Sequence, residues 1–184
     1  MEITKYLQDF AEQVCTCGKK HTLTVSRIVV KKGAIAELPE IVKELQYKKP
    51  FLLADKNTFA AAGKQVCSVL EEAKIGYSKY IFSTGEIEPD EKAVGSAVMH
   101  FDPTCDLVIA IGSGVINDIG KILANTANLP YFIVGTAPSM DGYASATSSM
   151  SMDGLKVSLP SKCADVIIGD IDVLKAAPMH MLKS

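Results

Sequence analysis

Hydrophobic and polar positions follow two alternating periods along this chain. Short apolar runs with the character of β-strands are separated by longer segments in which apolar residues recur at helical spacing. The predicted strands occupy residues 27–31, 50–55, 77–84, 105–114, 130–134 and 164–170. Regular alternation of strands and helices is typical of an α/β fold with a mostly parallel sheet, which we expect here.

Helical segments fill the intervals between these strands. The predicted helices occupy residues 34–45, 57–73, 90–101 and 115–128. Asn57 or Thr58 is the expected N-cap of the second helix, and Gly76 is expected to end it. Residues 1–26 begin with a further segment of helical spacing. We expect the helices to cover both faces of the sheet in a Rossmann-like arrangement.

The pattern changes after the fifth strand. Residues 135–150, "GTAPSMDGYASATSSM", contain almost nothing that a hydrophobic core could use. Two short β-like runs then flank Asp153-Gly154, a dipeptide suited to the type I′ turn of a β-hairpin. After the last strand, residues 172–184 begin as a helix. We expect one domain over residues 1–184.

The composition indicates a globular, cytosolic domain. The chain has 184 residues, of which 48% are hydrophobic and 22% charged. A net charge of −2 offers no basic surface to nucleic acid or to an anionic membrane, so a small-molecule partner is expected. No apolar run approaches the roughly 20 residues of a membrane span, and no signal-peptide pattern is present. Five cysteines without a secretory signal indicate reduced thiols.

A glycine turn, Gly112-Ser113-Gly114, breaks the most apolar strand directly before a helix. Glycine lets the backbone approach a ligand closely, and the N–H groups of a helix start favour an anion such as a pyrophosphate. The full dinucleotide fingerprint has a third glycine where this chain has Asp118. The turn therefore fits a dinucleotide site, and it fits equally a tight strand–helix connection without a ligand.

Asp55 ends the apolar strand "PFLLAD". An acid in this place can accept hydrogen bonds from the ribose of an adenosine. It can equally cap the helix that follows, and capping is the more common role of a lone acid there. The glycine turn further along the chain makes the nucleotide role attractive.

The hydroxyl-rich stretch after the fifth strand predicts a ligand-holding loop. Ligands of open α/β sheets bind at the carboxyl ends of the strands, which is where this stretch begins. Its polar side chains are Thr136, Ser139, Asp141, Ser145, Ser148 and Ser149. The stretch has no histidine and no G-x-S-x-G turn, which argues against nucleophilic serine chemistry. The alternative is a long polar surface loop.

The segment "CTCGKKH", residues 15–21, places two cysteines and a histidine close together. A structural zinc site needs four ligands, commonly as two spaced pairs, and no second Cys/His pair occurs in the chain. We expect no zinc there.

Three segments together resemble a known family. "IGSGVINDIGK", "GTAPSMDGYASATSSM" and "DGLKVSLPSKCADVIIGDIDVL" are similar to segments of the glycerol-1-phosphate dehydrogenases of archaea and some bacteria. These enzymes belong to the iron-containing alcohol dehydrogenase and dehydroquinate synthase superfamily. "CTCGKKH" also resembles a segment near the start of the bacterial members. The resemblance extends over essentially the whole chain.

The resemblance implies NAD- or NADP-dependent reduction of dihydroxyacetone phosphate to sn-glycerol 1-phosphate, a step of phospholipid biosynthesis. The glycine turn would wrap the cofactor pyrophosphate, and the loop after the fifth strand would line the nicotinamide half. The cofactor-binding residues so implied are Asp55, Gly112, Ser113, Gly114, Val115, Ile116, Thr136, Ala137, Pro138, Ser139 and Ser145. Asp141 would contact the phosphorylated substrate.

The resemblance also implies a part that this chain is expected to lack. In these enzymes a divalent metal (zinc, nickel or iron) polarises the substrate oxygen. Its ligands, one aspartate and two histidines, belong to an all-helical C-terminal domain of about 150 residues. We expect that domain to be absent here, with residues 172–184 starting the link to it, so the chain alone is expected to be inactive. The parent enzyme is expected to be a homo-oligomer.

Two alternatives stay open at this point. The parent could be another enzyme of the superfamily, a glycerol dehydrogenase or a 3-dehydroquinate synthase, or the chain could be a non-catalytic nucleotide-binding module. The choice between NAD and NADP is also open, because Asp55 favours a free 2′-hydroxyl while Lys56 tolerates a 2′-phosphate.

Overall fold

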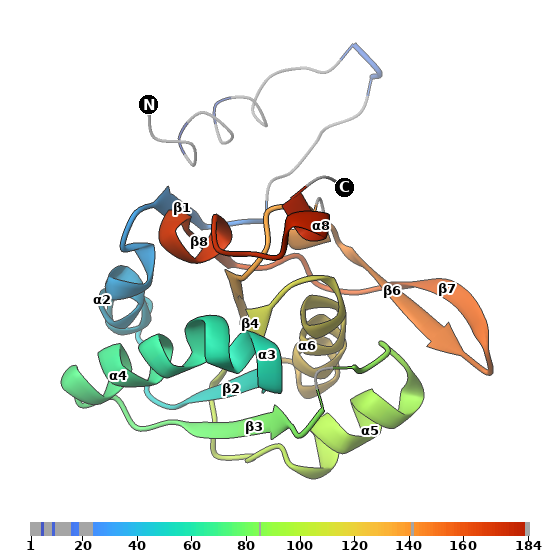
Figure 1. Ribbon diagram of the computed structural model, residues 1–184, viewed down its shortest axis with the longest axis horizontal. Coiled ribbons are helices and arrows are strands. Elements are labelled where there is room, and N and C mark those ends of the chain that lie inside the picture. The colour runs from blue at the N-terminus through green and yellow to red at the C-terminus, as the bar shows by residue number, and fades with distance from the viewer. Residues whose placement is uncertain are drawn as a thin grey trace.

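Six parallel strands form the centre of the molecule (Figure 1). The computed structural model describes residues 5, 9, 16–18, 24–84, 86–140 and 142–182. The strands of the sheet are β1 Arg27–Lys31, β2 Pro50–Asp55, β3 Ser78–Phe82, β4 Leu107–Gly112, β5 Tyr131–Gly135 and β8 Val166–Asp170. The predicted parallel α/β fold is thereby confirmed.

Helices cover both faces of this sheet. They are η1 Ala34–Glu37, α2 Leu38–Glu44, α3 Lys56–Thr58, η2 Phe59–Gly63, α4 Lys64–Glu72, α5 Glu91–Met99, α6 Gly114–Ala127, η3 Gly142–Ala144, α7 Ile171–Leu174 and α8 Met179–Leu182. Side chains of a strand point alternately to the two faces, so Leu52 and Ala54 pack with α2 and α4, whereas Phe51 and Leu53 pack with α5 and α6. The core therefore has two halves, one on each face.

An antiparallel hairpin follows the loop after β5. Its strands are β6 Thr147–Met152 and β7 Leu155–Pro160. Asp153 and Gly154 connect them with φ of 49° and 78°, which matches the two positive φ angles of the predicted type I′ turn. The hairpin extends from the body of the molecule (Figure 1), and none of the β7 residues is buried.

Both ends of the helical segment after β2 differ from the prediction. The predicted N-cap at Asn57 or Thr58 is wrong: Asp55 is the N-cap, because its carboxylate reaches the backbone N–H groups of both residues. Gly76 does not end that helix either. The helix ends at Glu72, and Lys74 takes the left-handed conformation with φ of 57°. The predicted helix within residues 1–26 falls mainly outside the described residues.

Strand order creates a crevice at one edge of the sheet. The order is β1-β8-β5-β4-β2-β3. After β2 the chain moves outward to β3, and after β4 it moves in the opposite direction to β5. The connections therefore diverge above the carboxyl ends of β2 and β4, the place where open α/β sheets bind ligands.

Candidate functional site

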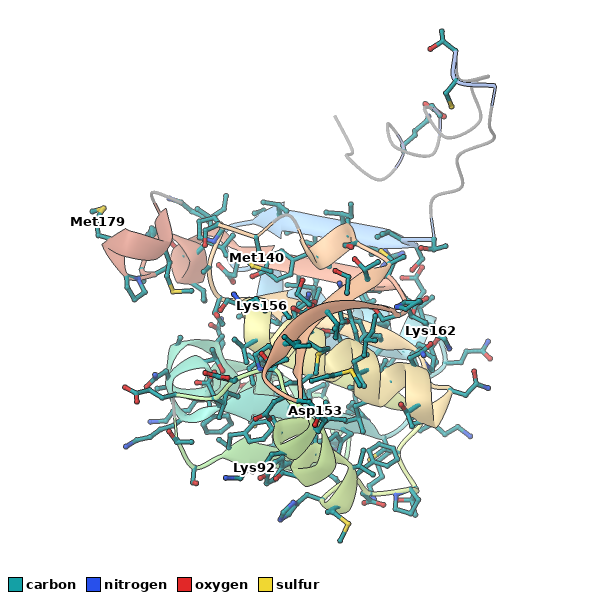
Figure 2. The ribbon with its side chains drawn as sticks, turned by 90° about the vertical axis from the view of Figure 1, so that its right-hand side faces the viewer. Lys92, Met140, Asp153, Lys156, Lys162 and Met179 are labelled. Carbon is teal, nitrogen blue, oxygen red and sulfur yellow. The ribbon has the colours of Figure 1, made fainter. Side chains whose placement is uncertain are left out.

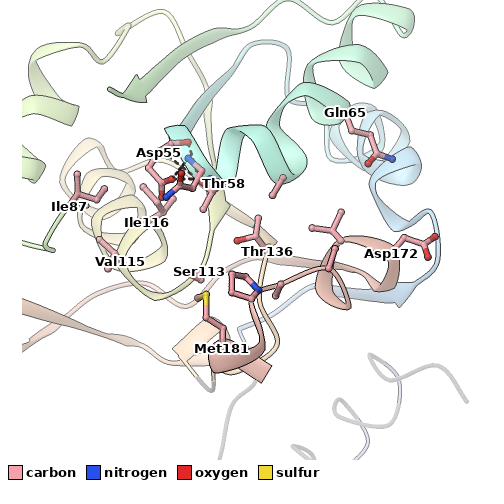
Figure 3. A pocket seen from close by; sticks show the side chains of 16 residues that line it. Asp55, Thr58, Gln65, Ile87, Ser113, Val115, Ile116, Thr136, Asp172 and Met181 are labelled. Atoms are coloured by element: carbon pink, nitrogen blue, oxygen red, sulfur yellow. Dashed lines mark hydrogen bonds between the residues drawn. The ribbon is translucent and has the colours of Figure 1, made fainter. Parts of the chain in front are cut away.

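A cavity of about 710 Å³ lies at this edge of the sheet (Figure 3). Four strands contribute to it at their carboxyl ends or just beyond: β2 through Asp55, β4 through Ser113, β5 through Thr136 and β8 through Asp172. Apolar side chains complete the wall; they include Ile87, Val115, Ile116 and Met181. A mainly apolar cavity with a few polar groups is the usual form of a cofactor site.

Asp55 caps a helix and lines the cavity at the same time. Its Oδ1 accepts hydrogen bonds from the N–H groups of Asn57, at 2.7 Å, and Thr58, at 2.9 Å. Thr58 Oγ1 in turn accepts from the Asp55 N–H at 3.0 Å, which completes a capping box. No hydrogen bond within the described chain engages Oδ2. The capping role is therefore present, and one carboxylate oxygen is still available to a ligand.

The glycine turn brings the start of α6 to the cavity. Ser113 is the N-cap residue of α6, and its side chain makes no capping hydrogen bond. Ser113 therefore offers no side-chain acceptor to the N–H groups of the first turn, where the helix dipole favours an anion. α6 has 14 residues, long enough for a full dipole.

Packing within the chain explains Gly112 of the turn and leaves little room at Gly114. A Cβ on Gly112 would lie 2.5 Å from the Cβ of Ile116, and one on Gly114 would lie 3.0 Å from the sulfur of Met140. Neither glycine has a positive φ. The close strand–helix connection that the sequence left open as an alternative thus accounts for Gly112, whether or not a phosphate binds there.

The loop after β5 is fastened to the end of β4. The Thr136 N–H donates to the Gly112 carbonyl at 3.0 Å. The hydroxyl of Tyr143 donates to the Ala137 carbonyl at 2.8 Å and lies 3.3 Å from the Gly112 carbonyl. Burial raises the pKa of Tyr143 to about 12, so the hydroxyl stays protonated and can donate. These bonds hold Thr136 at the cavity.

The structure brings together part of the predicted cofactor set. Asp55, Ser113, Val115, Ile116 and Thr136 line the cavity. The described lining does not include Gly112, Gly114, Ala137, Pro138, Ser139 or Ser145. Asp141, predicted to contact substrate, lies outside the described residues.

Ser145 takes part in the internal hydrogen bonds of its own loop. Its Oγ lies 2.9 Å from Thr147 Oγ1 and accepts from the Thr147 N–H at 3.1 Å. This arrangement stabilises the start of β6 and gives Ser145 a structural role beside the predicted one.

Sequence reasoning missed the wall formed by α4 and by the segment after β8. Gln65, Asp172 and Met181 line the cavity there. The carboxylate of Asp172 pairs with Lys175, which lowers the pKa of Asp172. Asp172 follows a buried strand closely, as Asp55 ends one, so the same signal was available for both.

The described residues offer no ligand set for a metal. Within that part of the chain, no three His, Cys, Asp or Glu side chains are grouped so that they could hold an ion. Cys15 and His21 of the "CTCGKKH" segment fall outside it, so the expectation about zinc stays a prediction. None of the described helices has the length and apolarity to span a membrane.

Comparisons with known proteins agree with the fold. Residues 29–178 match the family described as "Iron-containing alcohol dehydrogenase". The chain is similar to the glycerol-1-phosphate dehydrogenase [NAD(P)+] of Bacillus licheniformis, with 33% identity over 91% of the chain and 43% of that protein. The enzyme of the same name from Pyrococcus furiosus is 31% identical over 84% of the chain and 44% of its own length. The chain thus spans less than half of these relatives.

Solved structures share the same architecture. A glycerol dehydrogenase from Schizosaccharomyces pombe superposes with a TM-score of 0.76 at 22% identity, over 85% of this chain and 40% of that one. An archaeal alcohol dehydrogenase from a Red Sea brine pool gives 0.77 at 20% identity, over 89% of this chain and 48% of that one. At these identities the similarity concerns the fold alone.

Proposed function

Because the chain belongs to the iron-containing alcohol dehydrogenase family, we propose a function in dinucleotide binding. In this proposal residues 1–184 form the dinucleotide-binding domain of an NAD(P)-dependent glycerol-1-phosphate dehydrogenase. The observation that carries the proposal is the cavity above the diverging ends of β2 and β4, lined both by Asp55 and by the start of α6. This combination of an acid and a free helix N-terminus suits an adenosine ribose and a pyrophosphate.

In this proposal the chain's residues bind and orient the cofactor. Asp55 accepts a hydrogen bond from the ribose through Oδ2, and the N–H groups at Ser113 and Val115 bind the pyrophosphate. Thr136, held by the β4 end, lies on the nicotinamide side. A nicotinamide held there would supply or accept the hydride, and solvent the proton, that interconvert dihydroxyacetone phosphate and glycerol 1-phosphate.

The substrate half of the proposal depends on the loop after β5. Asp141 is the proposed substrate contact, and Ser139 is proposed to line the cofactor beside it. The two relatives bear the name of a glycerol-1-phosphate dehydrogenase, which supports this substrate class over glycerol or dehydroquinate. The metal that the family name implies has no ligand set among the described residues, so no step is derived through it.

A charge placed at the start of α6 tests the cofactor site. We expect NADH to bind the wild-type chain saturably, followed by nicotinamide fluorescence. Ser113→Glu places a carboxylate beside the pyrophosphate position and should raise the Kd at least about tenfold through charge repulsion. Ser158→Glu adds the same charge to the exposed face of β7 and should leave the Kd unchanged. Equal affinity of both variants for NADH would contradict binding of the pyrophosphate at the start of α6.

A further inference from the structure

Lys121 lies entirely inside the protein, with no exposed surface. It belongs to α6, and its Nζ donates to the carbonyl of Gly142 at 2.6 Å and to that of Thr147 at 3.1 Å. These two carbonyls stand at the ends of the segment that joins the loop after β5 to the hairpin. One ammonium group therefore holds both ends of residues 142–147.

Other buried polar groups support the same segment. Asn117 lies one turn before Lys121 on α6, and its Nδ2 donates to the Gly142 carbonyl at 3.3 Å. The hydroxyl of Tyr131 on β5 lies 3.1 Å from Asn117 Oδ1 and so fixes the amide. Asn117 and Tyr131 are as fully buried as Lys121. A continuous network thus joins β5, α6 and the loop.

Asp118 supplies the opposing charge. It is 9% exposed, and the Ser149 backbone N–H acts to lower the pKa of its carboxylate. Burial lowers the pKa of Lys121 and raises that of Asp118, while each charge favours the other. Burying an ammonium costs free energy unless it is well bonded, so an apolar side chain would suit a mere packing role better.

The helix that carries Lys121 also begins at the cavity. Ser113, the N-cap of α6, lines the cavity, and Lys121 follows about two turns later. The segment it holds belongs to the loop that is proposed to contact the nicotinamide half and the substrate. Helix α6 therefore contacts the proposed site twice, at its start and through this loop.

We propose that Lys121 is a positioning residue, which fixes the 142–147 segment against α6 and thereby sets the place of the loop on the nicotinamide side of the cavity. The inference rests on the proposed function for its effect on cofactor binding. The fixing of the segment itself can be tested without any ligand.

Amide hydrogen exchange tests the fixing of the segment. In Lys121→Met, which keeps the aliphatic stem, the amides of Ser145 and Thr147 should exchange at least about tenfold faster, as expected for the loss of a charge-assisted hydrogen bond. Amides of β4 and β8 should keep their rates. Lys156→Met, an exposed lysine on the hairpin (Figure 2), is the control and should change none of them. Unchanged exchange in Lys121→Met would overturn the proposal.

A comparison of two nucleotides separates positioning from general destabilisation. ADP occupies only the proposed site between Asp55 and Ser113, whereas NADH also reaches the loop. Lys121→Met should raise the Kd of NADH about tenfold and leave that of ADP unchanged. Equal weakening of both would reduce Lys121 to a structural residue. If the wild-type chain binds neither nucleotide, the proposed function fails, and hydrogen exchange still decides whether Lys121 fixes the segment.

A measurement on the wild-type protein tests the proposal even if the Lys121→Met variant does not fold. With ¹⁵N-labelled lysine, one ammonium resonance should have slowly exchanging protons and show hydrogen-bond couplings to the carbonyl carbons of Gly142 and Thr147. Its absence, with every lysine ammonium exchanging as in free solvent, would contradict the contacts on which the proposal stands.

Discussion

At the residue scale, single groups in this structure serve the fold and the proposed site together. Asp55, which lines the cavity, caps α3 with one carboxylate oxygen, and no hydrogen bond within the described residues uses the other. The sequence offered capping and ribose binding as alternatives, yet the two oxygens of a carboxylate permit both at once. Sequence alone could not show this, because the angle between β2 and the following helix decides which carboxylate oxygen makes the cap and which is left for a ligand.

The carboxylate of Asp55 should make the chain prefer NADH to NADPH. A carboxylate facing the ribose accepts from a 2′-hydroxyl and repels a 2′-phosphate, so NADH should bind about tenfold more tightly than NADPH. Asp55→Asn keeps an oxygen for the cap but removes the charge, and should bring the two affinities together. Asp153→Asn makes the same change at the hairpin turn (Figure 2) and should preserve the preference. Fluorescence titration with both cofactors measures the difference; a preference for NADPH in the wild type would contradict this role.

The buried hydrogen bond of the Tyr143 hydroxyl should contribute to the free energy of unfolding. Tyr143→Phe removes the hydroxyl that donates to the Ala137 carbonyl, and should lower the free energy of unfolding by about 1 kcal/mol. Tyr77→Phe removes an exposed hydrogen bond to Glu71 and should cost less than about 0.5 kcal/mol. Urea unfolding of the three proteins gives the comparison. Equal stability of the two variants would show that the buried Tyr143 bond contributes no more than the exposed bond of Tyr77.

At the scale of elements, the sequence predicted strands better than helix ends. The apolar run of β2 was predicted with the observed bounds, Pro50–Asp55, because polar residues flank a continuous apolar segment. The helix after it was misplaced at both ends, since its N-cap belongs to the strand and its C-terminal turn uses Lys74 instead of a glycine. Strand cores follow from local pattern, whereas helix ends depend on single hydrogen bonds.

The hairpin turn gives a prediction for one glycine. Gly154→Ala forces a side chain to φ of 78° and should destabilise the hairpin by about 1 kcal/mol. Gly76→Ala is the matched control, because a Cβ there meets nothing within 4 Å and φ is not positive. Hydrogen exchange of the β6 and β7 amides should therefore accelerate in the first variant only. Acceleration in neither variant would mean that the turn tolerates a side chain.

At the scale of the molecule, the two edges of the sheet have different roles. The carboxyl edge carries the cavity, while the amino edge carries a hydrogen-bonded hub at Asp102. Its carboxylate accepts from Lys49 Nζ at 2.7 Å and from Ser78 Oγ at 2.6 Å, next to the starts of β2 and β3. These bonds hold the pKa of Asp102 well below its usual value.

The hydrogen bonds to the Asp102 carboxylate should make the free energy of unfolding depend on pH. Since the folded pKa of Asp102 is depressed, its contribution is present above the unfolded pKa of about 4 and is lost as the pH falls through the folded pKa. Asp102→Asn should therefore be less stable than wild type at pH 7, and the gap should narrow below about pH 4. Urea unfolding across this range measures the gap. A gap that stays constant with pH would contradict the role of the charge.

The site was predictable only where its residues follow strands in the local pattern. Asp55, Ser113 and Thr136 were found because each ends or follows an apolar run. Asp172 follows β8 closely and could have been found in the same way, whereas Met181 had no such signal: β8, last of the sheet strands along the chain, inserts between β1 and β5 and so brings the segment of Met181 to the cavity. No local pattern encodes that insertion, which depends on pairing between strands far apart in the sequence.

The central claim is that the cavity at the carboxyl edge of the sheet binds a nicotinamide dinucleotide. Amide chemical-shift mapping of the ¹⁵N-labelled chain during titration with NADH tests it most directly. We expect saturable shifts that are largest at residues 55–58, at residues 113–116 and at Thr136. Shifts centred instead on the second hollow, around Thr24, Asn128 and Lys162, or no saturable shift at all, would contradict it.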